Sequence, residues 1–175
     1  MQRVLERKVT ELEPDNPLWR FAIAFWASPG TETACLDLQR KGWSVTRILS
    51  ACWLAISGQK YIGNEADTVT EWRTHVTESL RSARTFIPRN QPGTKSLRET
   101  IARSELEAER IELALTYQSL AETQQENAGM HGLEQLARTN LNGAAPKAAL
   151  DPDTGRLLDA LARHVVAFST GKQGA

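Results

Sequence analysis

The polar residues with the most site-like arrangement are arginines on one flank of a helix predicted over residues 67–87: Arg73, Arg81 and Arg84. Arg89 and Arg98 lie across the loop that follows this helix. A guanidinium group recognises phosphate or carboxylate through a planar fork of N–H donors, so this flank could bind an anionic ligand. The alternative is a solvated face paired with glutamates of the next helix. An aromatic residue and two of those glutamates complete the candidate ligand site: Trp72, Arg73, Arg81, Arg84, Glu105 and Glu109.

Other residue types that could support catalysis or bind a metal form no recognisable pattern. Glu71, His75 and Glu78 share one face of the same helix. A two-metal helical bundle, however, needs carboxylates from several helices and two Glu-x-x-His pairs, and the sequence contains no such pair. It also lacks a Gly-x-Ser-x-Gly nucleophile motif. These residues give no support for a catalytic function, and we expect neither a bound metal nor a cofactor.

The longest predicted helix, over residues 96–125, has apolar residues on two faces. One face carries Leu97, Ile101, Ser104, Ala108, Ile111 and Leu115. The opposite face carries Leu106, Leu113, Tyr117 and Leu120. A helix on the outside of a bundle needs only one apolar stripe. The second face is therefore either covered by the C-terminal segment, residues 133–168, or it binds a protein partner or a second copy of the chain.

Two helices that are apolar on nearly every side are expected at the centre of the fold, over residues 17–28 and 45–57. Helices of this kind must be buried in a protein core or in lipid. The second has about fourteen residues, whereas a membrane span needs about 20, so both are assigned to a protein core. Ser44 can cap the start of the second helix, and Gly58 can adopt the left-handed conformation that ends it.

The tryptophans and cysteines are expected to extend this core. Trp43 follows a glycine break and is expected to be partly exposed. The other tryptophans are assigned to the core: Trp19, Trp26, Trp53 and Trp72. Cys35 and Cys52 lie in apolar helical segments without the spacing of metal ligands, which favours buried free thiols of a cytosolic protein.

Start signals place the remaining helices. Thr31 can cap a short helix, Asp67 can cap the arginine-bearing helix, and Asp151 begins the last helix. Ser96 and Glu99 fit a capping box at the start of the long helix, because each side chain can satisfy one free N–H of the first turn.

The pattern predicts an all-α fold. We expect a single-domain bundle of six or seven helices with two nearly all-apolar central helices and one long two-faced helix. Residues 1–14 are expected to be a flexible N-terminal extension, residues 15–170 the helical domain, and residues 171–175 a disordered tail. Residues 129–150 are expected to be an irregular connection with a short helix near residues 133–141.

Charge and composition narrow the classes of function. The chain has 175 residues, and its lysines plus arginines equal its aspartates plus glutamates at 21 each. A dedicated nucleic-acid binder would normally carry a strongly basic domain or stripe, so we expect no nucleic-acid partner. The N-terminal residues are charged where a signal peptide would be apolar, and we find no candidate membrane span, which favours the cytoplasm.

Several stretches of the sequence resemble a known family. They lie at residues 18–30, 34–39, 45–58 with its Cys52-Trp53-Leu54, 72–73, 80–81 and 104–111. In this order they are similar to a bacterial family of uncharacterised cytoplasmic proteins, a domain of unknown function of about this length. The sequence departs from that pattern before Pro14 and over residues 85–93, where more basic residues are expected. The resemblance implies a helical, cytoplasmic protein and transfers no activity, cofactor or catalytic residue.

Two functions from different classes follow from the sequence. The first is a non-catalytic interaction or adaptor protein, which uses the second apolar face of the long helix or the arginine flank. The second is a small-ligand-binding bundle, or an enzyme, with its site near Trp72, the arginines and the two glutamates. A flat apolar patch would favour the first, and a closed pocket would favour the second.

Overall fold

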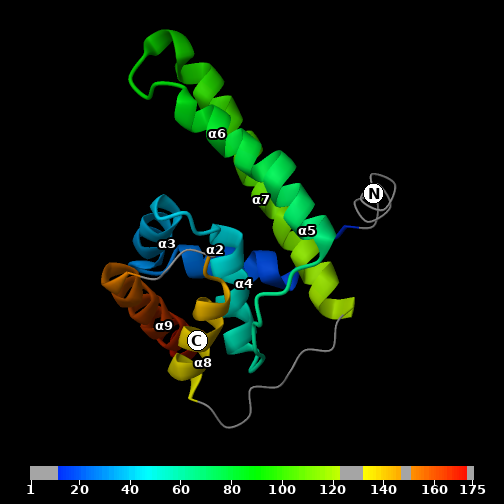
Figure 1. The fold of residues 1–175 in the computed structure, drawn as a ribbon, viewed down its shortest axis with the longest axis vertical. Helices are drawn as coiled ribbons and strands as arrows, with labels where there is room; N and C mark the ends of the chain where they lie inside the picture. The colour runs from blue at the N-terminus through cyan, green and yellow to red at the C-terminus, as the bar shows by residue number, and fades with distance from the viewer. Residues whose placement is uncertain (1–11, 123–131, 147–150, 173–175) are drawn as a thin grey trace. The chain divides into compact units, whose positions relative to one another are not determined.

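A computed structural model of the protein describes residues 12–122, 132–146 and 151–172. Within these ranges the chain forms helices and no β-strand, which confirms the all-α prediction (Figure 1). The helices are α2 (Pro17–Trp26), α3 (Thr31–Arg40), α4 (Val45–Ile56), α5 (Asp67–Trp72), α6 (Glu78–Phe86), α7 (Lys95–Glu122), α8 (Leu133–Gly143) and α9 (Pro152–Lys172). A π-helical turn, η1 (Arg73–Thr77), joins α5 to α6, and a 3-10 turn, η2 (Pro92–Thr94), precedes α7.

The contacts within the chain group it into two compact units. The five-helix unit contains α2, α3, α4, α8 and α9. The hairpin unit contains α5, η1, α6 and α7. The short helix expected near residues 133–141 is confirmed as α8.

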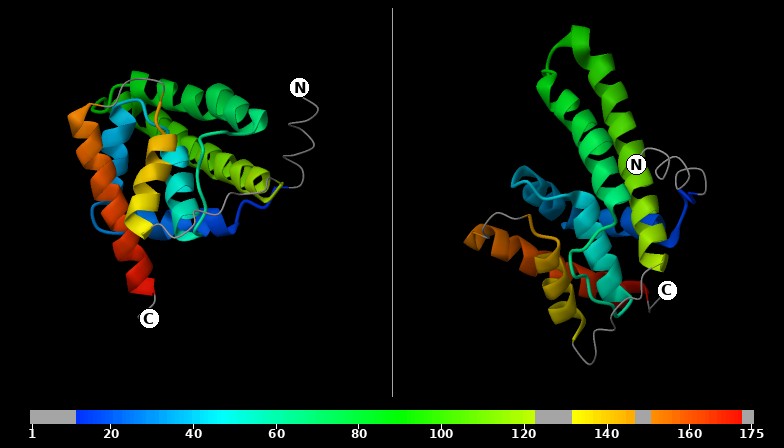
Figure 2. Two further views of the ribbon diagram at one scale, coloured as in Figure 1. Left: turned by 60° about the horizontal axis from the view of Figure 1, so that its bottom comes forward. Right: turned by 45° about the vertical axis from the view of Figure 1, so that its right-hand side comes forward.

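Helix α4 is the centre of the five-helix unit, because α2, α3, α8 and α9 all contact it (Figures 1 and 2). Nine of its twelve residues are buried, as its nearly all-apolar sequence predicts. Both end signals are confirmed. The Ser44 side chain accepts a hydrogen bond from the backbone N–H of Arg47 at 3.4 Å, and Gly58 follows the helix with a φ of 70°.

Helix α2 buries one face rather than its whole circumference. Leu18, Phe21, Ala22 and Phe25 are buried, whereas Ile23 is 53% exposed. The buried face packs aromatic rings: Phe21 and Phe25 stack at 5.2 Å, and Phe168 of α9 meets both edge-on. The prediction that α2 is a fully enclosed helix is therefore wrong for its outer side.

The tryptophan assignments are also corrected. Trp43 is only 3% exposed, so the expectation that it is partly exposed is wrong. The tryptophans assigned to the core are only half-buried: Trp19, Trp26, Trp53 and Trp72. An indole ring combines a large apolar surface with a polar N–H, and it fits a boundary position as well as an interior one. Cys35 and Cys52 are buried and free, as expected.

The predicted start of α3 differs from the structure, whereas that of α9 agrees with it. Gly30, in a left-handed conformation, precedes α3, and the Thr31 hydroxyl is buried without a hydrogen-bond partner among the described residues. Thr31 is thus the first helical residue and not the cap. Asp151 does cap α9, because its carboxylate accepts from the Thr154 N–H at 2.7 Å. Helix α9 continues to Lys172, into the predicted disordered tail, whose last residues lie outside the described ranges.

Asn140 of α8 pins the loop that follows α4. Its side-chain amide donates to the carbonyl oxygens of Ala51 at 3.2 Å and Gln59 at 2.9 Å, and its Oδ1 accepts from the Tyr61 N–H at 2.9 Å. The Asn140 side chain is fully buried. A buried amide with its groups satisfied in this way fixes the loop against α8.

In the hairpin unit, the chain of α5, η1 and α6 runs antiparallel to α7 (Figures 1 and 2). Ala66 precedes α5, so Asp67 is the first helical residue and not the cap. The capping box is also wrong: α7 begins at Lys95, one residue before Ser96, because η2 leads directly into it. The predicted end of α7 near residue 125 lies outside the described residues.

Candidate functional site

Arg73 is the centre of a buried ion-pair network in the hairpin unit. Its Nε donates to Oε1 of Glu112 at 2.7 Å. Its Nη1 and Nη2 donate to the two carboxylate oxygens of Glu65 at 2.7 and 2.6 Å, a bidentate pair. Thr77 donates from Oγ1 to the other oxygen of Glu112 at 2.9 Å. Each oxygen of the fully buried Glu112 carboxylate thus receives a donor.

The electrostatics of this cluster keep Arg73 charged. Burial alone would lower the pKa of Arg73, but the hydrogen bonds and charges of Glu65 and Glu112 outweigh burial and raise that pKa above its usual value. Arg73 and Thr77, which bind Glu112 from the other arm of the helical hairpin, are the first and last residues of the η1 turn. A π-helical turn holds one extra residue and is frequent at functional sites.

A second tier of the network lies nearer the end of the hairpin. Arg81 donates to Glu105 at 3.0 Å and to Glu109 at 2.6 Å. Arg84 binds Glu105 through two of its nitrogens, one of them at 3.0 Å. Burial would raise the pKa of Glu105, but the bonds from Arg84 and Arg81 outweigh it and lower that pKa. Arg98 then donates from Nη1 to the carbonyl oxygen of Arg84, in the last turn of α6, and to that of Ile87 at 2.6 Å.

Glu109 differs from the other glutamates of the network. Burial raises its pKa to about 7, and the neighbouring charges of Glu105 and Glu112 add to this rise. The Arg81 guanidinium opposes the rise without cancelling it. Glu109 therefore titrates near neutral pH.

The other side of the hairpin carries an open apolar groove of about 380 Å³. From α5, η1 and α6 it is lined by Trp72, Val76 and Leu80, and from α7 by Arg103, Ser104, Glu107, Ala108 and Ile111. Trp72 is oriented by a hydrogen bond from its Nε1 to the carbonyl oxygen of Ala108 at 2.9 Å. We call these residues the hairpin groove. Its large side chains, Trp72, Val76, Leu80 and Ile111, are only half-buried.

The structure brings the predicted ligand-site residues into this hairpin. Arg81 and Arg84 meet Glu105 and Glu109, the pairing that the alternative interpretation of the arginine flank expects. Trp72 lies on the groove side, whereas Arg73 binds glutamates that the predicted site did not include. Ligand binding by this set stays a prediction.

Four members of the network lie outside the predicted ligand site: Glu65, Thr77, Arg98 and Glu112. Glu112 follows Glu109 by three residues and Glu105 by seven, so its place on the same face was detectable. Glu65 lies in the loop before α5, and no periodic signal marks it. The η1 turn that ends in Thr77 also has no sequence signal.

The four residues predicted to form a partner interface differ in exposure. Leu106 is 53% exposed, Leu113 is buried, and Tyr117 and Leu120 are half-buried. Other large apolar side chains are exposed where the hairpin turns: Phe86 is 90% and Leu97 is 55% exposed. The exposed apolar surface of the hairpin unit thus includes the turn between α6 and α7.

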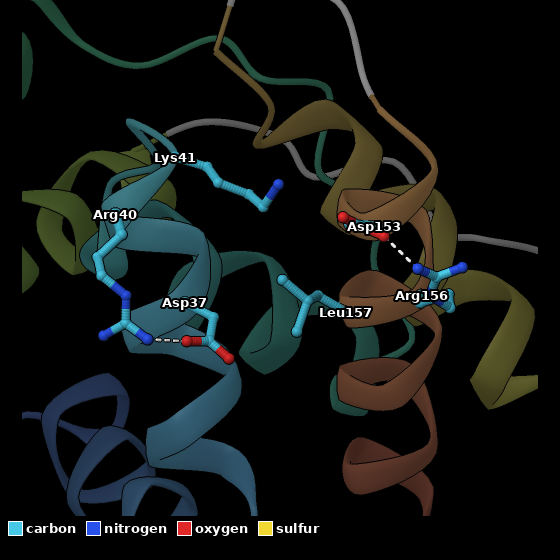
Figure 3. A pocket seen from close by; sticks show the side chains of 6 residues that line it. All are labelled: Asp37, Arg40, Lys41, Asp153, Arg156 and Leu157. Carbon is cyan, nitrogen blue, oxygen red and sulfur yellow. Dashed lines mark hydrogen bonds and ion pairs between the residues drawn. The ribbon is translucent and has the colours of Figure 1, made fainter.

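A second cavity, of about 430 Å³, opens between α3 and the start of α9 in the five-helix unit. Asp37, Arg40 and Lys41 line it from the α3 side, and Asp153, Arg156 and Leu157 line it from α9 (Figure 3). Arg40 pairs with Asp37, Arg156 pairs with Asp153, and Lys41 lies 3.0 Å from Asp151. Each cation therefore already has an aspartate, and the cavity offers no excess charge to a ligand.

Two further properties apply to the part of the chain that the structure describes. It contains no group of three or more histidine, cysteine or acidic side chains that could hold a metal ion. None of its helices combines the length and the apolar character needed to cross a bilayer.

The fold and the network define an all-helical protein with a hairpin held together by buried arginine–glutamate pairs. The chain belongs to the family described as protein of unknown function (DUF2390), whose model matches residues 17–116. This confirms the resemblance to a domain of unknown function. Comparisons with curated proteins and with solved structures found no match to either. The family description assigns no activity.

Proposed function

We propose that this protein is a non-catalytic cytoplasmic interaction protein that binds a protein partner through the hairpin groove. The observation that supports this proposal is an open apolar groove with half-buried large side chains, Trp72, Val76, Leu80 and Ile111. The opposite side of the same hairpin is closed by the arginine–glutamate network. A helix pair that is closed on one side and apolar on the other suits an amphipathic partner helix.

A small-ligand site at the arginines has less support. Arg73, Arg81 and Arg84 each bind at least one glutamate, so an anionic ligand would have to displace a carboxylate from a partly or wholly buried pair. The groove, in contrast, needs no rearrangement to accept an apolar surface. Removing its half-exposed side chains from water would itself favour binding.

The proposed partner site uses α7, as the sequence predicts, but through the stripe that contains Ala108 and Ile111. The expected interface stripe includes Leu113, which is buried in this structure, and this reduces what that stripe can offer a partner. The cytoplasmic assignment is supported by Cys35 and Cys52, which are free, since unpaired cysteines are typical of reducing compartments.

Affinity purification combined with chemical cross-linking tests the proposal. The wild-type protein is compared with Leu80→Glu, which places a charge in the groove, and with Ser82→Glu, which places the same charge at an exposed position of α6. We expect cross-links to the groove in the wild type and in Ser82→Glu, and their loss in Leu80→Glu. Recovery of the same cross-linked proteins with all three chains would overturn the proposal, provided that circular dichroism shows equal helicity.

A further inference from the structure

The rim of the hairpin groove carries one exposed cation and one exposed anion, a helical turn apart on α7. Arg103 makes a hydrogen bond to the Thr100 hydroxyl at 3.1 Å and no ion pair within the described residues. Glu107 is 67% exposed at its side chain and lies 3.8 Å from Arg110, a distance at the limit of an ion pair. Both charges are thus available to an occupant of the groove.

The apolar stripe beside this rim has small residues at its middle and large residues at its ends. Leu97 and Ile101 lie on one side, and Ile111 lies on the other. Ser104 and Ala108 lie between them, and the Ser104 hydroxyl is bound to the carbonyl oxygen of Thr100 in its own helix. Small side chains at a helix crossing allow two helices to pack closely. The stripe therefore favours another helix that crosses near Glu105.

From these two features we propose that the hairpin groove is filled by the hairpin of a second copy of this chain. This inference rests on the proposed function and names the partner. The two-fold axis lies in the interface, perpendicular to α7 and level with Glu105, so that α7 meets α7 of the second copy in antiparallel orientation. Arg103 then lies opposite Glu107 of the partner subunit, and Glu107 lies opposite Arg103 of the partner subunit. The two hairpins together form a four-helix bundle.

The size and charge of the surface agree with such an assembly. The paired part of the hairpin is about 30 Å long, at about 1.5 Å per helical residue, and two helices present a face about 20 Å wide. This is of the same order as the ~800 Å² that each partner buries in a stable interface. The rim is self-complementary because each sign of charge meets the other, and the formal net charge of zero adds no long-range repulsion between copies.

Charge reversal tests the proposal specifically. The full-length wild type, Arg103→Glu, Glu107→Arg and the double variant are each analysed by light scattering and sedimentation over a range of concentration. We expect a wild-type dimer and a rise of the dissociation constant by at least about tenfold in each single variant, because two like-charged pairs replace two ion pairs. The double variant restores both pairs and should return to the wild-type constant. A mixture of the two single variants should form the heterodimer.

The outcomes separate this inference from the proposed function. A wild-type monomer at all concentrations, or single variants that dimerise like the wild type, would overturn the second-copy assignment. The groove could then still bind a different protein, which the Leu80→Glu cross-linking experiment tests independently. Failure to fold is distinguished by circular dichroism, since Arg103 and Glu107 are both exposed and the helicity of α7 should not change.

Discussion

Arg73 Nε and Glu112 Oε1 lie 2.7 Å apart, with 10% and 0% of their side chains exposed. An ion pair in such a place gains little net energy from being formed, because both groups lose their hydration. Its removal from one side is costly, because the remaining charge stays buried without a partner. The pair therefore holds α7 to η1 mainly through the penalty for breaking it.

Replacing Arg73 by methionine tests this conclusion. The change leaves the carboxylates of Glu112 and Glu65 without their cation, and we expect the free energy of unfolding to fall by about 3–5 kcal/mol. Urea denaturation followed by circular dichroism measures it. Lys95→Met is the matched control, since Lys95 is exposed and lies 3.9 Å from Glu99, and it should change stability by less than about 0.5 kcal/mol. Equal effects of the two variants would show that the buried pair contributes no more than a surface pair.

The raised pKa of Glu109 predicts how the stability of the hairpin depends on pH. Burial raises its pKa to about 7 from an ordinary value of 4.5, so between these values the folded state binds more protons than the unfolded state. The contribution of Glu109 to stability is therefore greatest below pH 4.5 and falls as the pH rises through 7. The slope is at most about 1.4 kcal/mol per pH unit. Denaturation of Glu109→Gln at pH 5, 6, 7 and 8 should show this part of the dependence removed, and an unchanged slope would contradict the assignment.

The fold class and the centre of the five-helix unit could be predicted from the sequence, because both depend on the local periodicity of apolar residues. The residues of α4 are apolar at most positions, with Ser44 and Gly58 as end signals, and the structure agrees with each. The predictions that are wrong rest on residue types that are compatible with two different positions in a fold. A tryptophan suits an interior or a boundary position. The sequence therefore predicts Trp43 partly exposed and Trp53 in the core, whereas Trp43 is buried and Trp53 is half-buried.

The candidate site was predictable in its residue types and only partly in its connections. The spacing of Arg81 and Arg84, and of Glu105 and Glu109, places each pair on one helix face, and the structure joins the two faces. The partnership of Arg73 with Glu65 depends on a loop and on a π-helical turn, neither of which has a periodic signature. Contacts of this kind require the three-dimensional fold.

The hydrogen bonds of the Asn140 side chain are expected to stabilise the loop after α4 in the five-helix unit. Replacing it by leucine removes the acceptor of the Tyr61 N–H and the donor to the Gln59 carbonyl, both at 2.9 Å. These backbone groups would lose the hydrogen bonds that Asn140 supplies, so we expect a loss of about 2–4 kcal/mol and faster amide exchange at Tyr61. Hydrogen exchange measured residue by residue checks this. Thr139→Ala, at an exposed position of the same helix, should leave the Tyr61 exchange rate unchanged, and if Asn140→Leu also left it unchanged the loop would be held by other contacts.

Two glycines of the five-helix unit should respond to alanine in opposite directions. Gly63 has a φ of 79°, and a Cβ atom there would lie 2.6 Å from the carbonyl oxygen of Gly143. Gly63→Ala therefore combines a left-handed backbone with a clash against another backbone group, and we expect a loss of at least about 2 kcal/mol. Gly155 lies in the first turns of α9, where a Cβ atom has nothing within 4 Å. Gly155→Ala restricts the unfolded chain without a steric penalty and should raise stability by about 0.5–1 kcal/mol. Chemical denaturation of both variants measures the two changes, and a shift in the same direction would mean that the loop at Gly63 relaxes to accept the side chain.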